Sequence, residues 1–356
     1  MSKSMTIAVV YDAAALNRDE KIGNNVLSIK KMTKGNKIYS AISRVSQTHH
    51  LFNTLNSLNP STWKETKVSP SGSGEKKVIQ FDLKTENIIT SAELDFFGYM
   101  GTESMNMRKS PIGMTKVLSL LPWEGDLLFY ANHGLIKRAK NDDPSIQPNP
   151  YSKEEHSSLY NGNITVNGNV LGRDYWLMEE ANVEEKEDSL SVVSKKVKYK
   201  FQGFKKISEN EYENDRGIIK IEQVKNNDKA LKIIFTLKKE ERERRLRDFL
   251  KVIRNGIVFQ SSGEAPGLNP IFLVAAIVDV PMPVFNGYVE LNQEELKKGS
   301  FKIKASNLNN ALKNQYIQKY FVYDGIDLLD DELEAVQEKK IDEWDTFVNE
   351  FLNEAE

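Results

Sequence analysis

Basic and small polar residues gather at one predicted helix start. A run of lysines precedes a segment, residues 39–58, in which apolar side chains recur at helical spacing. The run consists of Lys30, Lys31, Lys34 and Lys37. Ser40 or Ser43 can cap the helix, so unpaired backbone N–H groups, the helix dipole and cationic side chains converge there. This pattern predicts a phosphate-binding site.

The predicted helix has an apolar stripe and a polar side. The stripe consists of Ile42, Val45, Phe52 and Leu55, and the polar side of Arg44, Gln47, Thr54 and Ser57. His49 falls on the stripe, where we expect a hydrogen-bonded core histidine. His50 lies nearer the polar side and can contact a base or a phosphate.

Carboxylates close to the first predicted strand allow a second chemistry. Asp12, Asp19 and Glu20 could hold a hydrated metal ion for phosphodiester cleavage. They could equally pair with the neighbouring lysines. The sequence has no P-loop spacing and no G-x-S-x-G motif, and it has no cysteine, which excludes cysteine nucleophiles, disulfides and zinc-thiolate sites.

Charge is divided unevenly along the 356 residues. Residues 326–356 carry a net charge of −10, so the remaining chain carries +8. A basic body suits a polyanionic partner. The acidic end has a broken apolar stripe and is expected to be a terminal helix, or to dock on a neighbouring basic surface.

Coarse patterning predicts an α+β fold. The predicted strands cover residues 6–11, 117–121, 160–171 with a turn, and 272–280, and the predicted helices cover residues 39–58 and 240–254. We expect a long loop over residues 20–37, a mobile loop over 59–77, a buried segment over 92–101 and a projecting arm within 122–156. The frame fits a βαββαβ core of the ferredoxin-like or RRM-like kind.

Location and membrane association follow from what is missing. No secretory signal is visible, and the longest apolar run, residues 271–278, is too short to cross a bilayer. Together with the absence of cysteine, this predicts a cytoplasmic protein without a membrane partner.

Several stretches resemble a known family. The segment ALNRD, residues 15–19, is followed by a basic glycine loop and the helix start YSAISRVSQ. LDFFGYMG (residues 94–101), SPIGMTKVLSLLPW (110–123) and the stretch over 260–289 follow in the same order. The chain resembles the CRISPR-associated RAMP-superfamily backbone subunits, the Cas-seven family. With EEHSSLY at 154–160, it is most similar to the DevR branch of type I-B systems.

The resemblance implies a hand-shaped molecule. A modified RRM-like palm would occupy residues 1–325, with a fingers-side loop at 59–91, a thumb at 122–156 and an unassigned insertion at 179–239. Residues 326–356 form the acidic terminal part. Copies of the subunit would stack along one CRISPR RNA beside the cap, large, small and RNA-processing subunits of a Cascade complex. The guide's base edges would stay free to pair with target DNA.

Site residues follow from the matched motifs. The expected RNA contacts near the helix start are Asn17, Arg18, Lys30, Lys31, Lys34, Ser40, Ser43, Arg44, Gln47 and His50. The middle blocks add Arg108, Lys109 and Lys116, and the late loop adds Gln260, Ser261 and Ser262. No metal or cofactor is expected.

Two alternatives accompany the expectation of a non-catalytic guide-binding subunit. Some type III relatives cleave RNA with an aspartate in the loop where Asp19 lies, so a metal-dependent ribonuclease of the same fold is the first. The second is a DNA-binding autoregulator, although the sequence shows no helix-turn-helix.

Overall fold

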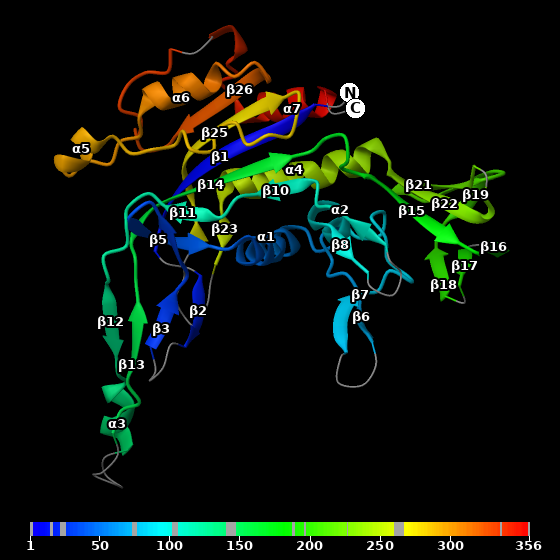
Figure 1. The fold of residues 1–356 in the computed structure, drawn as a ribbon, viewed down its shortest axis with the longest axis horizontal. Helices are drawn as coiled ribbons and strands as arrows, with labels where there is room; N and C mark the ends of the chain where they lie inside the picture. The colour runs from blue at the N-terminus through cyan, green and yellow to red at the C-terminus, as the bar shows by residue number, and fades with distance from the viewer. Residues whose placement is uncertain are drawn as a thin grey trace.

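The computed structural model describes residues 3–14, 17–21, 26–72, 77–101, 106–139, 147–186, 189–195, 197–225, 227–259, 267–334 and 337–354. Figure 1 shows an elongated molecule with a layered body, a narrow arm at one end and a second β structure at the other. The two termini lie side by side, where the backbone N–H of Lys3 donates to the carbonyl of Glu354 at 3.0 Å.

One sheet organises the body. Its order is β26 (Ile317–Asp324), β25 (Pro270–Val278), β1 (Ser4–Ala13), β14 (Ser158–Val166), β11 (Val117–Ser119), β5 (Lys37–Ile42) and β4 (Lys31–Lys34). The short strand β10 (Ile112–Met114) also pairs with β14. All of these pairs are antiparallel. The predicted strand over residues 6–11 is therefore confirmed as an inner strand, β1.

Both faces of this sheet are covered. Helices α1 (Arg44–Leu58), α4 (Lys239–Asn255) and α7 (Trp344–Glu354) pack on one face, against Ile7 and Val9 of β1. Helix α6 (Ala305–Leu312) and the segment from 284 to 303, which includes α5 (Gln293–Lys297), cover Ala8 and Val10 on the other face. Successive residues of a strand point to opposite faces, so β1 is apolar almost throughout.

Helix α1 begins later than the pattern predicted. Residues 39–42 belong to β5, and Ser43 is the N-cap, accepting a hydrogen bond from the backbone N–H of Ser46 at 3.2 Å. The predicted apolar stripe is wrong at Val45, which is 79% exposed. His49 is exposed as well, and its ring bonds to Asn53 on the same helix. The buried side instead carries Gln47, Leu51, Phe52 and Leu55.

The arm contains strands from two parts of the chain. β12 (Leu127–Tyr130) pairs with β13 (Tyr151–Glu154), β13 with β3 (Val26–Ile29), and β3 with β2 (Arg18–Lys21); α3 (His133–Ala139) lies farther out along the arm. A loop over residues 20–37 was therefore the wrong prediction for the described residues. β3 joins the arm, and β4 forms a hairpin with β5.

A hairpin and a short helix project beside the arm in Figure 1. β6 (Val68–Ser71), which lies within the predicted mobile loop over 59–77, pairs with β7 (Val78–Phe81), which follows that loop. Helix α2 (Ala92–Phe97), capped by Ser91, follows, and then β8 (Tyr99–Met100) pairs with β9 (Met107–Arg108). Ala92, Leu94, Asp95 and Phe96 are buried, as expected for this segment.

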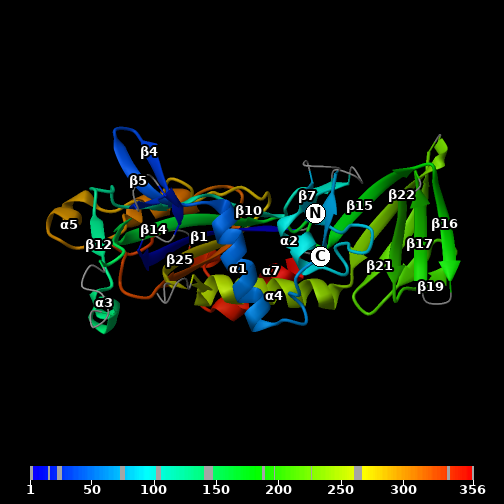
Figure 2. The same ribbon diagram turned by 90° about the horizontal axis from the view of Figure 1, so that it is seen from below.

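The second β structure has its own core. β15 (Arg173–Glu179), β22 (Asn227–Leu237), β21 (Gly217–Val224), β20 (Glu211–Glu213) and β19 (Lys205–Ser208) form one sheet. β16 (Ala181–Lys186), β17 (Ser189–Ser194) and β18 (Val197–Gln202) form another. Trp176, Phe201 and Phe235 pack between them. Figure 2 shows this pair of sheets set apart from the body.

A cluster of buried charges joins α2 and β9 to α4. Asp95 of α2 accepts from Arg108 at 2.8 Å and lies 3.5 Å from Arg245 of α4. Arg245 is fully buried and also pairs with Glu241 and donates to the carbonyls of Ile88 and Ile89. Such groups tolerate burial only when they are paired, so this cluster fixes α2 against α4.

The described part of the acidic end packs against the body. Phe347, Val348, Phe351 and Leu352 of α7 are buried in the core, and the 3-10 turn η2 (Gln337–Lys339) precedes them. The short strands β23 (Ile257–Val258) and β24 (Gly267–Leu268) pair beneath α1. The whole is a mixed α+β fold with more strand than helix. No helix among the described residues is long and apolar enough to cross a membrane.

Candidate nucleic-acid interface

The start of helix α1 is held by Asn17. The side-chain oxygen of Asn17 accepts from the backbone N–H of Ser43 at 2.8 Å, and its backbone carbonyl accepts from the N–H of Lys30, also at 2.8 Å. Arg44 follows the cap and is exposed. Asn17 and Ser43 therefore set the backbone of this corner, and Arg44 presents a cation beside it.

Two predicted contact residues anchor the arm. Lys31 Nζ lies 2.8 and 2.7 Å from the carboxylate oxygens of Glu154 and 3.9 Å from the centre of the Trp123 ring. Arg18 donates to the Glu154 carbonyl and to Glu155. Burial raises the pKa of Glu154, but hydrogen bonds from Lys31, the Ile29 N–H and Ser28 outweigh it and hold that pKa below its usual value.

Ser40 is buried among polar partners. Its Oγ lies 2.7 Å from His156 Nδ1 and 2.7 Å from Tyr160 Oη, and its backbone N–H donates to Ser119 Oγ. A serine beside a histidine can act as a nucleophile, but Ser40 is 1% exposed and leaves no access for a substrate. Burial lowers the pKa of His156 and raises that of Tyr160 to about 12. The cluster joins β5 to the arm.

A groove opens on the same sheet face as α6, over the part of that face that α6 does not cover. We call it the palm groove. It has a volume of about 490 Å³. Its lining includes Lys34, Tyr39, Lys116, Asn161, Asn163 and Lys304. Lys34 and Lys116 are exposed, and neither they nor Lys304 form an ion pair with any described carboxylate. The lining also contains Glu290, whose carboxylate accepts from Asn307, so three lysines against one carboxylate give the groove a net positive charge.

The floor of the palm groove comes from β14. Asn161 and Asn163 alternate with Gly162, so both amides face the groove, while a Cβ at Gly162 would lie 2.6 Å from Val117 on the other face. The side-chain oxygens of Asn161 and Asn163 are buried without a hydrogen-bond partner among the described residues. Buried polar atoms normally have partners, so these two oxygens are unsatisfied acceptors; because they are buried, a donor on a ligand reaches them only if the surrounding side chains move.

Helix α1 supports one wall of this groove. Gln47 is buried and donates to the carbonyls of Ile42 and Thr115, the second at 3.0 Å. Thr115 and Asn163 exchange backbone and side-chain hydrogen bonds across the groove edge. Gln47 thus positions the groove. His50 stacks on Phe259 with the ring centres 3.9 Å apart, and burial, followed by the charge of His49, lowers its pKa.

The remaining predicted residues lie elsewhere. Arg108 is 7% exposed and bonded to Asp95, so its guanidinium is not available to RNA. Lys109 is exposed but lines a separate groove beside β15. Gln260, Ser261 and Ser262 lie outside the described residues, as do the side chains of Asp19 and Glu20. In the described part of the chain no three potential ligand side chains converge on a metal site, and Asp12 lines yet another pocket.

Family membership rests on the sequence. Residues 5–297 match the family described as "CRISPR-associated negative auto-regulator DevR/Csa2". The chain belongs to the DevR/Csa2 family. The resemblance seen in the motifs is thereby confirmed at the level of the family.

Solved structures match this DevR/Csa2 chain in fold. A chain titled "CRISPR RNA-guided surveillance complex" aligns with a TM-score of 0.52 and 11% identity, covering 99% of this chain and 100% of that one. A chain titled "CRISPR RNA-guided surveillance complex, pre-nicking" gives 0.51 and 12%, with coverage of 99% and 100%. No curated protein matches the chain.

Sequence reasoning missed half of the palm groove in this DevR/Csa2 member. Tyr39 was placed in a helix, and Lys304 was not considered. Asn161 and Asn163 flank Gly162 in a stretch predicted as a strand with a turn, and neither amide was considered as a site residue. The usable signal was the polar alternation itself, because two amides on one side of a buried strand need partners.

Proposed function

We propose that the chain is a non-catalytic subunit that binds CRISPR RNA in a type I-B surveillance complex and assembles along the guide with copies of itself. The palm groove carries this proposal, because its lining combines three lysines, none of them paired with a described carboxylate, with one acidic residue, Glu290. Lysines bind phosphates regardless of sequence, and an amide oxygen can accept a hydrogen bond from a ribose 2′-hydroxyl. The guide's base edges would remain free to pair with target DNA.

The order of elements supports an RRM-like palm. The elements follow one another along the chain as β1, α1, the two short strands β10 and β11, β14, α4 and β25. In the sheet the neighbours are β25, β1, β14 and β11 in that order. This is a strand-helix-strand-strand-helix-strand unit with both helices on one face. We assign the arm as a thumb and the β6–β7 hairpin with α2 as fingers, which gives the hand shape.

Exposed apolar residues on the arm favour assembly. Leu127, Leu128 and Phe129 of β12 are all exposed. Burying these three apolar side chains against another protein would be favourable, and a neighbouring copy or another subunit would supply the covering surface.

Fluorescence anisotropy with unrelated single-stranded RNAs tests the binding. The purified protein should bind labelled 30-nucleotide RNAs of different sequence with affinities within about threefold, falling steeply with added salt. Strong preference for one sequence, or no binding at low salt, would contradict the proposal.

The proposal excludes guide-directed cleavage by this subunit. Labelled RNA complementary to the guide should stay intact when incubated with the guide-loaded protein and Mg²⁺ or Mn²⁺. Cleavage that disappears in Asp19→Ala would assign a ribonuclease instead.

The description of the family as a negative auto-regulator also favours a second function, autoregulation through DNA. This would require the protein to bind the duplex upstream of its own gene about 10³-fold or more tightly than a shuffled duplex. A competition experiment with the two duplexes measures that ratio directly.

A further inference from the structure

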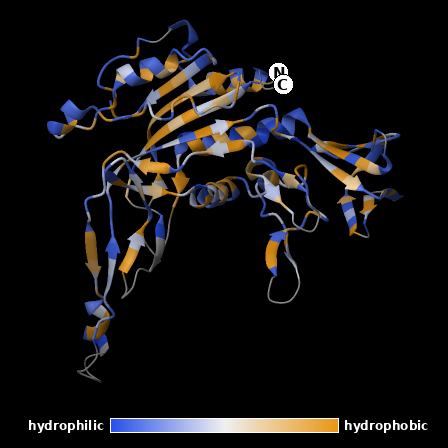
Figure 3. Ribbon diagram, in the orientation of Figure 1, coloured by the Kyte–Doolittle hydropathy of each residue, from blue (hydrophilic) through white to orange (hydrophobic). Residues whose placement is uncertain are grey.

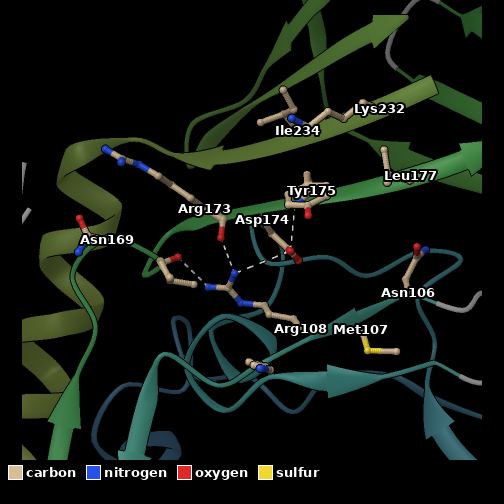
Figure 4. A pocket seen from close by; sticks show the side chains of 12 residues that line it. Asn106, Met107, Arg108, Asn169, Arg173, Asp174, Tyr175, Leu177, Lys232 and Ile234 are labelled. Carbon is tan, nitrogen blue, oxygen red and sulfur yellow. Dashed lines mark hydrogen bonds and ion pairs between the residues drawn. The ribbon is translucent and has the colours of Figure 1, made fainter. Parts of the chain in front are cut away.

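A second groove lies beyond the palm, between β9 and the sheet formed by β15 and β22; we call it the fingers groove. Its volume is about 590 Å³. Arg108 lies along its floor, held by Asp95 and by the backbone carbonyls of Arg173 and Val170, and Figure 4 shows the contacts with the two carbonyls. The floor is therefore rigid and its charge is compensated.

The walls of the fingers groove carry uncompensated positive charge. Lys109, Arg173 and Lys232 line it, and none of them forms an ion pair with a carboxylate in the described part of the chain. Asp174, the acidic residue of the lining, already accepts from Tyr99 and lies 3.8 Å from Arg108. The net charge offered to a ligand is positive.

A neighbouring arginine adds to this charge. Arg242 on α4 is close to Gly172, and burial, followed by repulsion from Arg173, lowers its pKa. Glu243 and Asp95 offset part of this repulsion, and a bound anion would offset the remainder.

An exposed aromatic ring lies among these cations. Tyr175 is 56% exposed, and Lys232 Nζ lies 5.0 Å from the centre of its ring. Arg173, Tyr175 and Leu177 alternate along β15 on one face of the sheet, and Met107 is exposed on the opposite wall. An aromatic platform beside a row of cations is the arrangement that binds single-stranded nucleic acid, through stacking and phosphate contacts.

We propose that the fingers groove binds single-stranded DNA, with bases stacked on Tyr175 and phosphates held by Lys109, Arg173 and Lys232. This inference rests on the proposed function, because a guide that pairs with one strand of a duplex leaves the other strand single. The fingers groove is distinct from the palm groove assigned to the guide, because the two have no lining residue in common, and Figure 1 shows β15 towards the end of the molecule opposite the arm.

The test uses the full-length protein loaded with guide RNA and a labelled dT20 oligonucleotide, which cannot pair with a mixed-sequence guide. The variants are Arg173→Gln, Lys232→Gln and Tyr175→Ala. Lys205→Gln is the matched control, an exposed lysine on the same sheet outside the groove. Affinity is measured at several salt concentrations, and the amount and length of the bound guide are measured in parallel.

We expect Tyr175→Ala to weaken dT20 binding about tenfold. Each cation variant should lower the salt slope by about 0.7. Guide content and Lys205→Gln should match the parent. Equal dT20 binding by all variants would overturn the proposal, and so would loss of guide RNA from the groove variants. It would also be overturned if unlabelled polyglutamate displaced the labelled dT20 more effectively than unlabelled dT20 does.

Failure of the proposed function gives a different result. Protein that is purified without guide RNA would contradict that function. The affinity of the RNA-free protein and its variants for dT20 would still test whether the fingers groove binds single-stranded DNA.

Discussion

Lys31 and Glu154 form a paired contact, with the lysine ammonium within 2.8 Å of both carboxylate oxygens. The pair joins β4 at the edge of the body sheet to β13 at the base of the arm. Lys34 lies three residues farther along β4, so its side chain is on the other face of the strand; it has no such partner among the described residues and lines the palm groove. Two lysines in one short strand thus have separate tasks, one in the arm and one at the groove.

The first prediction separates these tasks. Lys31→Met should speed amide hydrogen exchange in β3 and β13, because it leaves Glu154 without its cation, whereas Lys34→Met should leave exchange there unchanged. The pKa of Glu154 is lowered by this contact, so the stabilisation is complete above its ordinary pKa of 4.5 and is lost as the pH falls through the lower folded-state value. Identical exchange in the two variants would show that Lys31 does not anchor the arm.

The palm groove and the start of α1, where Arg44 is exposed, give the second prediction. Lys34→Gln, Lys116→Gln and Arg44→Gln should each weaken binding of unrelated RNAs by a similar factor and lower the salt slope by about 0.7 per lost phosphate contact. Lys313→Gln, an exposed lysine at the end of α6, is the control. A loss that depends on the RNA sequence would mean that these residues read bases.

The third prediction concerns the unpartnered amides. Asn163 is 3% exposed and its side-chain oxygen has no described donor, so Asn163→Leu should leave the unfolding free energy unchanged or raise it while weakening RNA binding. Gln47→Leu is the contrasting variant. It removes an amide that donates to two carbonyls and should cost about 1–3 kcal/mol in a denaturant titration. Parent-like RNA binding by Asn163→Leu would remove the amide from the site.

The fourth prediction is a pH dependence at the base of the arm. Burial lowers the folded-state pKa of His156 below 6.5, so the unfolded chain binds a proton more readily. Stability is therefore complete above pH 6.5 and falls as the pH drops from there towards the lowered folded-state pKa. The pKa of His50 is lowered too, so the denaturant midpoint should be followed in His156→Asn and His50→Asn separately. An unchanged slope in His156→Asn would contradict the assignment.

The fifth prediction tests the buried charge cluster. Asp95→Ala leaves Arg108 and Arg245 without their shared carboxylate and should cost about 3–5 kcal/mol in unfolding free energy. Glu294→Ala, which breaks an exposed pair with Lys297, should cost less than about 1 kcal/mol. Similar losses in the two variants would show that the cluster does not hold α2 against α4.

Strong periodicity predicted the long elements. The buried side of α4, with Leu246, Phe249, Leu250 and Ile253, and the inner strands β1 and β25 lie where their apolar patterns indicated. The start of α1 was placed too early, because Tyr39 and Ile42 fit a helical stripe as well as a strand. The antiparallel pairing of β5 with β4 and β11, which no local pattern reveals, decided between the two.

The contacts of the candidate site residues could not be predicted from the sequence. Among the lysines clustered near α1, pairing partners far away in sequence decide which side chains are open to a ligand. Lys31 pairs with Glu154, and Arg108 pairs with Asp95. Lys34 and Lys116 line the groove instead. Tertiary contacts of this kind are invisible to charge counts.

The most direct test of the central claim is the nucleic acid that the protein carries after purification. The protein is expressed with and without a CRISPR array, and the ratio of absorbance at 260 and 280 nm is measured together with the length of any bound RNA. We predict discrete RNA of guide length only with the array, and its loss from the Lys34→Gln, Lys116→Gln double variant. An RNA-free monomer that also binds no single strand at low salt would contradict the assignment of the palm groove as the guide site.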